Sequence, residues 1–276
     1  MRLFSKDIML YSSPKGWSVA RKTDLIPSMG NVSIAYGNKE FVRLKNNNIK
    51  QPIAEQSTDI NNWEIVTSYQ SSGDAIKIIY DGTKFVTFIK DSSDTKMCIV
   101  RYSTNLDSWD WNYLPEIYNY KWIDFIYNGV NWVALSEDGY VSVSNNAMRG
   151  SWSTPIQLAS EPIGPDKWLH LIFDNEKIIA IGQDRWASVS IDNGNTWTPY
   201  RNNITSDFDT VIYANKFIAI AGSNVFESTD GNTWVDLGEN INLNLPMAKD
   251  KWAAMTKNDN VIVALSDYGY ISTKRI

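Results

Sequence analysis

The stretch "SIDNGNTW" at Ser190–Trp197 is followed by a near copy of itself, "STDGNTW", at Ser228–Trp234. Looser copies, each with a serine and a closing tryptophan, are "SSPKGW" (Ser12–Trp17), "STDINNW" (Ser57–Trp63), "STNLDSW" (Ser103–Trp109) and "SNNAMRGSW" (Ser144–Trp152). Successive closing tryptophans are 37 to 46 residues apart. A period of that size indicates one supersecondary unit that is copied along the chain.

The segments around each copy have the pattern of short β-strands. Two apolar runs joined by a polar turn come first, as in "IIYDGTKFVTF" (78–88) and "FIYNGVNWVAL" (125–135). A third run, such as "GYVSVS" (139–144), leads into the copy, and a fourth, such as "WTPYR" (197–201), begins at its tryptophan. Asp-Gly and Asn-Gly turns between β-branched and aromatic residues predict hairpins. The sequence therefore predicts an all-β fold, a six-bladed β-propeller of four-stranded antiparallel blades, as a single domain over residues 1–276.

The two ends of the chain predict how the ring closes. The C-terminal segment supplies a hairpin and a third strand, whereas "GWSVARK" (16–22) near the N-terminus reads as a fourth strand. A closing blade shared by the N- and C-termini would leave no exposed edges between blades. "DIMLYSS" (7–13) also has the pattern of a third strand, so it competes with residues 268–273 for one place in that blade.

Composition bounds the class of protein. The chain has 276 residues, 43% of them hydrophobic, and a net charge of −5 with both signs interspersed, so no basic footprint for nucleic acid is present. The single cysteine, Cys98, lies in an alternating apolar segment and is expected to be a buried thiol. No apolar run reaches the roughly 18 residues of a membrane helix, and the opening stretch has no signal-peptide pattern. We therefore expect neither membrane insertion nor a signal peptide.

"SIDNGNTW" fits the Ser-x-Asp-x-Gly-x-Thr-Trp pattern of the Asp-box, and "STDGNTW" is that box shortened by one residue. The chain therefore resembles sialidase-like (BNR-like) propellers and the propellers of phage tail and adhesion proteins. The resemblance implies that the repeated phrase is a non-catalytic turn between the third and fourth strands of a blade. With a single cysteine and no signal-peptide pattern, the protein is expected to be a virion component or cytoplasmic. Asp192 starts no EF-hand series, so no metal site is expected. Aspartate bonded to its own loop, glycine at positive φ and a buried tryptophan suit such a turn.

Alternating strand directions would place these turns and the hairpins on one face, and the irregular crossovers between blades on the other. Three crossovers end in a lysine–tryptophan pair: Lys121-Trp122, Lys167-Trp168 and Lys251-Trp252. Indole faces suit the C–H surfaces of sugars, and ammonium groups suit anionic groups. These six residues are predicted ligand-binding residues. The alternative is that the tryptophans pack between blades while the lysines point into solvent.

Aligned innermost strands share a mostly polar column: Ser33, Lys77, Asp124, His170, Thr210 and Ala254. Such a column predicts a wet central channel, and Lys77, Asp124 and His170 join the predicted ligand-binding residues. His170 is the only histidine, and a lone histidine is more often structural than catalytic. We expect His170 and Asp124, from neighbouring blades, to approach each other.

Three classes of function follow from these features. The first is a sialidase-like glycoside hydrolase, for which the resemblance requires three arginines, a Tyr–Glu pair and an aspartate; only Arg43, in "EFVRLKN", loosely fits. The second is a non-enzymatic propeller that binds a cell-surface glycan or a protein partner, plausibly in a phage tail, fibre or baseplate. The third is a purely structural assembly platform, with homo-oligomers possible. We favour the second class, with no cofactor, no metal, no nucleic acid and no catalytic residue.

Overall fold

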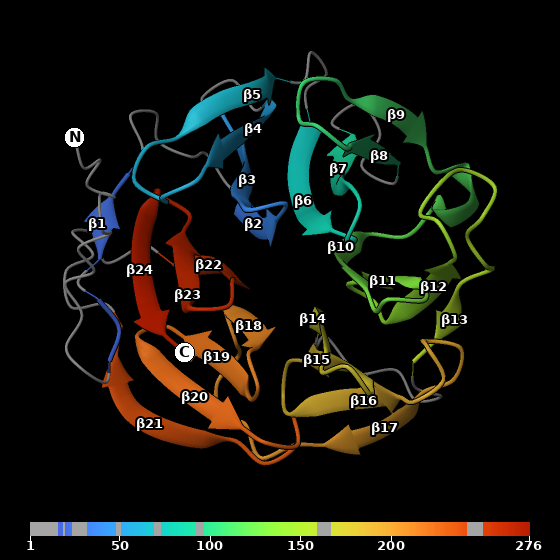
Figure 1. Cartoon of the computed structure of the whole chain (residues 1–276). Coiled ribbons are helices and arrows are strands. Elements are labelled where there is room, and N and C mark those ends of the chain that lie inside the picture. Colours follow the sequence, from blue (N-terminus) through green and yellow to red (C-terminus); the bar gives the residue numbers. More distant parts are fainter. Residues whose placement is uncertain are drawn as a thin grey trace, which may run out of the picture.

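The computed structural model describes residues 16–18, 20–23, 32–47, 51–68, 73–91, 97–158, 167–241 and 251–276. Six four-stranded antiparallel sheets form a ring of blades around a central axis, so the predicted six-bladed propeller is confirmed (Figure 1). Five of the blades start at the axis and add strands outward in chain order, and the sixth takes its outermost strand from the N-terminal part of the chain. The one helical segment among these residues is a short 3-10 turn, Pro115–Ile117.

Five blades are continuous in sequence. Blade I contains β2 (Val32–Gly37), β3 (Glu40–Asn46), β4 (Pro52–Ser57) and β5 (Glu64–Ser68), and blade II contains β6 (Gly73–Tyr80), β7 (Phe85–Asp91), β8 (Cys98–Ser103) and β9 (Asp110–Tyr113). Blade III contains β10 (Trp122–Tyr127), β11 (Trp132–Ser136), β12 (Tyr140–Ser144) and β13 (Ile156–Gln157). Blade IV contains β14 (Trp168–Phe173), β15 (Ile178–Gly182), β16 (Trp186–Ser190) and β17 (Thr198–Arg201), and blade V contains β18 (Thr210–Tyr213), β19 (Phe217–Ala221), β20 (Asn224–Ser228) and β21 (Val235–Asn240).

The sixth blade joins the two ends of the chain, as predicted. It contains β22 (Trp252–Lys257), β23 (Val261–Ser266) and β24 (Tyr270–Arg275), and β1 (Arg21–Lys22) pairs with β24 as the outermost strand. The contact continues beyond β1, because the Ser18 N–H donates to the Thr273 carbonyl at 2.8 Å. β24 therefore holds the third position in this blade, and residues 7–13 lie outside the described residues.

The core is divided into layers between blades. Each of six hydrophobic clusters draws its side chains mainly from two neighbouring blades. In one of them Phe88 of blade II stacks on Phe125 of blade III, with ring centroids 3.8 Å apart. Cys98 is buried in the same layer, and burial raises the pKa of its thiol, as expected for a structural cysteine. Burial between blades is what fixes each sheet against the next.

The loops between third and fourth strands each begin at a serine and end at a tryptophan, and we call them the Ser–Trp turns. They are Ser57–Trp63, Ser103–Trp109, Ser144–Trp152, Ser190–Trp197 and Ser228–Trp234. In the turn of blade IV, Asp192 accepts from the Ser190 hydroxyl and the Thr196 N–H, both at 2.8 Å, and the Trp197 indole N–H donates to the Gly194 carbonyl at 2.9 Å. Gly194 has φ 92°, the left-handed region that favours glycine. The turn thus satisfies its own polar groups and points its tryptophan inward.

The two faces of the ring differ as predicted. The β10–β11 hairpin meets the Ser–Trp turn of the next blade, since Asn128 Nδ2 donates to Asn193 Oδ1 at 3.0 Å. Hairpins and Ser–Trp turns therefore share one face. Crossovers and the loops between second and third strands lie on the opposite face, which we call the loop face.

Candidate binding site at the central channel

The three predicted tryptophans are buried, which contradicts the expectation that they present stacking faces. Trp122, Trp168 and Trp252 are 4%, 2% and 1% exposed. Each opens an innermost strand and packs into the layer against the preceding blade. The Trp122 indole N–H donates to the Ile117 carbonyl at 2.6 Å, so its polar edge is also satisfied. The physical reason is that a large ring at the start of an innermost strand fills the wedge between two blades.

Two of the predicted lysines are held by one carboxylate on the loop face. Lys121 and Lys167 contact the two carboxylate oxygens of Glu137, at 2.5 and 2.8 Å. Burial alone would raise the pKa of Glu137, but the hydrogen bonds and charges of the two ammonium groups outweigh it and hold the pKa below its usual value. The pair of contacts links blade III to the crossover that enters blade IV. These lysines are therefore not free cations, although their side chains stay half-exposed.

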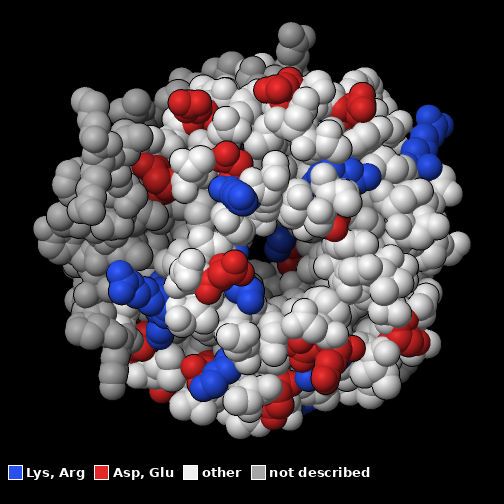
Figure 2. All heavy atoms as spheres, in the orientation of Figure 1, with Lys and Arg blue, Asp and Glu red and all other residues white. Residues whose placement is uncertain are grey.

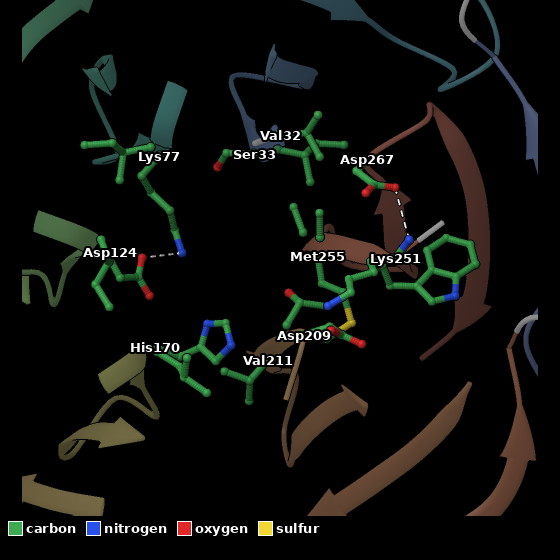
Figure 3. Close-up of a pocket in the computed structure, with 18 residues that line it drawn as sticks. Val32, Ser33, Lys77, Asp124, His170, Asp209, Val211, Lys251, Met255 and Asp267 are labelled. Atoms are coloured by element: carbon green, nitrogen blue, oxygen red, sulfur yellow. Dashed lines mark hydrogen bonds and ion pairs between the residues drawn. The ribbon is translucent and has the colours of Figure 1, made fainter. Parts of the chain in front are cut away.

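The third lysine and the column residues lie elsewhere, at one central cavity of about 370 Å³. Its wall includes all six column positions, one from each innermost strand, together with Lys251, Asp209 and Asp267 (Figure 3). The predicted alignment of the column with a central channel is thus seen in the structure. Figure 2 shows the opening at the centre of one face of the ring, with acidic and basic side chains interspersed around it.

The backbone of the innermost strands explains why polar side chains occur at the column position. Innermost strands are sheet edges that face the axis, so their N–H and C=O groups need partners. In four of these strands the register with the second strand shifts just before the column residue, as between Trp122 and Asp124 or between Trp168 and His170. Such bulges re-aim side chains and free backbone groups. A polar side chain at the next position can then bond to the neighbouring blade.

Three column residues make such bonds between blades. Ser33 Oγ accepts from the Ile78 N–H at 3.0 Å, and Asp124 Oδ2 accepts from the Leu171 N–H at 2.8 Å. His170 Nε2 lies 2.8 Å from the carbonyl oxygen of Phe208. The channel wall is therefore held together partly by its own polar lining.

Lys77 and Asp124 form an ion pair across blades II and III. Lys77 Nζ lies 2.7 Å from Asp124 Oδ1, and the carboxylate also accepts from the Phe125 N–H at 2.8 Å. Asp124 is almost fully buried, whereas a third of the Lys77 side chain is exposed. A buried carboxylate needs this set of donors, because an unpaired buried charge is strongly unfavourable.

His170 lies beside Asp124 on the next innermost strand, and both line the same cavity. Their hydrogen bonds go to other partners, but the charge of Asp124 acts on the imidazole. Since a carbonyl only accepts, its contact with Phe208 assigns the proton to Nε2 and leaves Nδ1 as an acceptor. Burial lowers the pKa of His170 and outweighs the opposing effects of Asp124, the Phe208 contact and Asp209. The ring is therefore neutral near pH 7.

Two cavity residues were missed by the sequence alignment. Asp209 lies one position before the column residue Thr210, where the other blades carry apolar residues, and this exception is the signal that could have found it. Asp267 lies in a loop between second and third strands, at the place Glu137 holds in blade III. Asp209 Oδ2 accepts from the Gly222 N–H at 2.7 Å, and Asp267 Oδ1 accepts from the Lys251 N–H at 3.0 Å.

Arg43, the one arginine with a loose match to the glycosidase motif, does not line this cavity. Its side chain is buried in blade I, where Nε donates to Glu55 Oε2 at 2.6 Å and the guanidinium lies 4.1 Å from the Trp63 ring centroid. Nη1 also donates to Thr23 Oγ1 at 3.1 Å, beside the strand that closes the ring. This arginine therefore has a structural role.

Two features are absent from the described residues. No group of three or more histidine, cysteine, aspartate or glutamate side chains is arranged to hold a metal ion in this part of the chain. No helix within the described ranges is long and apolar enough to span a membrane.

The fold is similar to several solved propellers. YCF48 from Cyanidioschyzon merolae superposes with a TM-score of 0.60 and 11% identity, over 93% of this chain and 99% of that one. A structure described as YCF48 bound to D1 peptide gives a TM-score of 0.55 and 15% identity, over 88% and 77% of the two chains. A chain of the Mitotic Checkpoint Complex gives 0.64 and 7%, over 100% and 96%. At these identities the likeness shows the fold alone. No family model and no curated protein matches the sequence.

Proposed function

We propose that this protein is a non-catalytic recognition propeller that binds a protein partner over the channel opening on the loop face. The observation that carries the proposal is the central cavity, to which every innermost strand contributes a side chain. Its wall mixes ammonium groups, carboxylates, hydroxyls and an imidazole with apolar residues. A concave site with a few convergent polar groups is the usual form of a binding site.

The hydrogen bonds of the cavity carboxylates favour binding over glycoside hydrolysis, which is the competing proposal. A glycosidase uses two carboxyl groups roughly 5–10 Å apart, one of which must carry a proton. Here Asp124 is held by Lys77 and two N–H donors, and Asp209 and Asp267 each accept from a backbone N–H. These fixed donors suit ionised carboxylates that shape a surface.

The choice of a protein partner over a glycan rests on two points. One similar propeller is described as bound to D1 peptide, and another as part of the Mitotic Checkpoint Complex. The three tryptophans that would have stacked on sugar rings are buried between blades. A cell-surface glycan remains the second candidate, supported by the mixture of donors and acceptors along the channel wall.

We further propose that the Ser–Trp turns are Asp-boxes and that the protein belongs to a phage particle, such as its tail, fibre or baseplate. The support is the match of Ser190–Trp197 to the box pattern, together with the hydrogen bonds of Asp192 within that turn. The test is immunogold labelling of purified particles from the source; absence of label on intact and disrupted particles contradicts this location.

The binding proposal is tested by blocking the channel. Ala254 occupies the column position in blade VI, so Ala254→Tyr would fill part of the cavity, while Ile156→Tyr on the outer strand β13 is the matched control. We expect peptides selected from a displayed library on the wild-type protein to lose at least about tenfold in affinity for A254Y and to keep it for I156Y.

Three outcomes decide between the candidates. Equal affinity of both variants for the selected peptides places the site outside the channel and contradicts the proposal. Signals on a glycan array that A254Y abolishes, without any peptide signal, favour the glycan. Hydrolysis of a glycoside by the purified protein contradicts a non-catalytic role. Coincident unfolding transitions of the two variants show that both are folded.

A further inference from the structure

One corner of the cavity has open acceptors on two neighbouring blades. His170 projects from blade IV and Asp209 precedes β18 of blade V, and both are directed into the cavity (Figure 3). Asp209 Oδ2 accepts from the Gly222 N–H, and Oδ1 has no hydrogen-bond donor among the residues that the structure describes. Thr210 follows Asp209 and also lines the cavity; it is 5% exposed, and its hydroxyl has no hydrogen-bond partner within the described part of the chain. The corner thus offers a carboxylate oxygen, a hydroxyl oxygen and an imidazole nitrogen.

The charges around this corner do not balance. Asp124 and Asp209 both act on the imidazole, against the single ammonium of Lys77. Lys77 is already paired with Asp124 at 2.7 Å, and no ion pair joins Asp209 to a cation within the described residues. Lys251 and Asp267 belong to blade VI, the blade next to Asp209, and bring one charge of each sign. The described side chains that line the cavity therefore carry one more negative than positive charge, with His170 neutral.

The imidazole does not supply the missing positive charge. Burial at the channel wall disfavours its charged form more than the two carboxylates favour it. The contact with Phe208 keeps the proton on Nε2, so Nδ1 presents a lone pair.

We propose that the corner formed by His170, Asp209 and Thr210 binds one cationic group, the guanidinium or ammonium end of an arginine or lysine side chain. Asp209 supplies the charge, and Thr210 and His170 Nδ1 accept the remaining N–H donors. A cation with several donors matches a site made only of acceptors and one carboxylate. That the side chain belongs to a protein partner rests on the proposed function; the chemistry of the corner does not.

The test uses the only histidine in the chain as its reporter. N-acetyl-arginine amide is titrated into the full-length protein while the His170 imidazole signals are followed by NMR, and N-acetyl-citrulline amide, its neutral isostere, is the comparison ligand. We expect the arginine compound to shift the signals with at least about tenfold higher affinity, because only it carries a charge. Equal affinities, or no shift with either compound, overturn the proposal.

Two variants sharpen the test. Asp209→Asn removes the charge but keeps an oxygen for the Gly222 N–H, and we expect it to reduce the preference for arginine over citrulline to less than about threefold. Asp110→Asn, an equal change of charge on the exposed strand β9, should leave the preference intact. If D209N keeps the full preference, the cation lies elsewhere.

Proton linkage gives a second readout. The charged and titratable groups that face His170 are Asp124, Lys77 and Asp209, and a bound cation adds one more positive charge. The arginine compound should therefore lower the pKa of His170, and its affinity should fall as the pH drops through that pKa, by the same factor. An unchanged or raised pKa contradicts the proposal. If the corner binds arginine but no selected peptide depends on the channel, the proposed function fails and this inference stands. If selected peptides depend on the channel but the corner does not prefer arginine, this inference fails and the proposed function stands.

Discussion

The Ser–Trp turns of blades I and II contain no glycine, yet the residue three positions before their tryptophan is left-handed, as are the glycines at that position in blades IV and V. Ile60 and Leu106 have φ of 58° and 67°, against 92° at Gly194 and 76° at Gly231. In all four, the tryptophan that closes the turn donates its indole N–H to the carbonyl of this residue, at 2.9 to 3.2 Å. The hydrogen bonds of the turn, rather than one residue type, are therefore what the repeat preserves.

The two kinds of turn differ in what fills the space beneath them. A Cβ atom at Gly231 would lie 2.3 Å from Ile179 Cδ1 of the preceding blade. Ile60 and Leu106, in contrast, are buried and contribute to the layers between blades. A left-handed residue that carries a Cβ atom costs roughly 1–2 kcal/mol, which burial of its side chain, about 2–3 kcal/mol, offsets. The glycine turns avoid backbone strain, whereas the turns with Ile60 and Leu106 are strained but bury an additional apolar side chain.

The largest expected effect comes from placing isoleucine, the left-handed residue of the blade I turn, at the glycine position of the blade V turn. Gly231→Ile combines left-handed strain with a clash, so we expect a loss of about 3 kcal/mol in the free energy of unfolding, measured in urea. Gly222→Ile is the matched control, because Gly222 has φ 58° with no atom near its Cβ position; strain alone should cost about 1–2 kcal/mol there. Equal losses would show that the space beneath the turn is irrelevant.

The reverse change should also destabilise, but less. Ile60→Gly relieves the strained φ while it removes a side chain that is 2% exposed. Loss of the buried side chain outweighs relief of strain, and we expect about 2 kcal/mol less stability by the same urea unfolding measurement. A more stable variant would mean that strain, not burial, dominates in blade I.

The indole bond can be isolated at two tryptophans that are both half-buried. Trp197 donates to Gly194, whereas Trp17 Nε1 has no hydrogen-bond partner within the described residues. Trp197→Phe should therefore cost about 1 kcal/mol more than Trp17→Phe in thermal or urea unfolding. The same loss of stability in both variants would show that the indole hydrogen bond of Trp197 does not contribute to stability and that the ring contributes only by packing.

The smallest expected effect on stability comes from the charge of the Asp59 carboxylate. Burial alone would raise the pKa of Asp59, but hydrogen bonds from Asn62, Asn61 and Ser57 outweigh it and lower the pKa to about 2. Because the folded-state pKa lies below its ordinary value of 3.8, the stabilisation is present above that value and is lost as pH falls towards 2. Asp59→Asn, which copies the Asn105 of blade II, should change stability at pH 7 by less than about 0.5 kcal/mol.

The same variant should show a shallower loss of stability between pH 4 and 2, followed as the urea midpoint at each pH. A decline parallel to that of the wild type would contradict the contribution assigned to Asp59.

The fold was predictable because its signals are local. Turn residues at a fixed period, and apolar alternation on either side of them, indicate six hairpins from the sequence alone. The column through His170 was predictable for the same reason, since aligned repeats place equivalent residues at equivalent depth. Asp209 was missed because it lies one position before the column, just ahead of β18, a strand whose register does not shift.

The ligand-binding residues were less predictable, because exposure and pairing are not local. The Lys-Trp pairs looked alike in sequence, but the indoles fill wedges between blades, and two of the ammonium groups meet Glu137. Arg43 resembled a glycosidase residue until its partners, Glu55 and Thr23, were known.

By itself, the sequence determined the strand order, the turns and the ring, since hydrogen bonds within a turn and alternation within a strand involve residues a few positions apart. Only the tertiary structure decided which side chains remain free. The ion pair of Lys77 with Asp124 and the contact of His170 with Phe208 join different blades, and pairing across blades depends on how sheets twist and pack around the axis. That packing leaves Asp209 open at the channel, a property of the assembled ring.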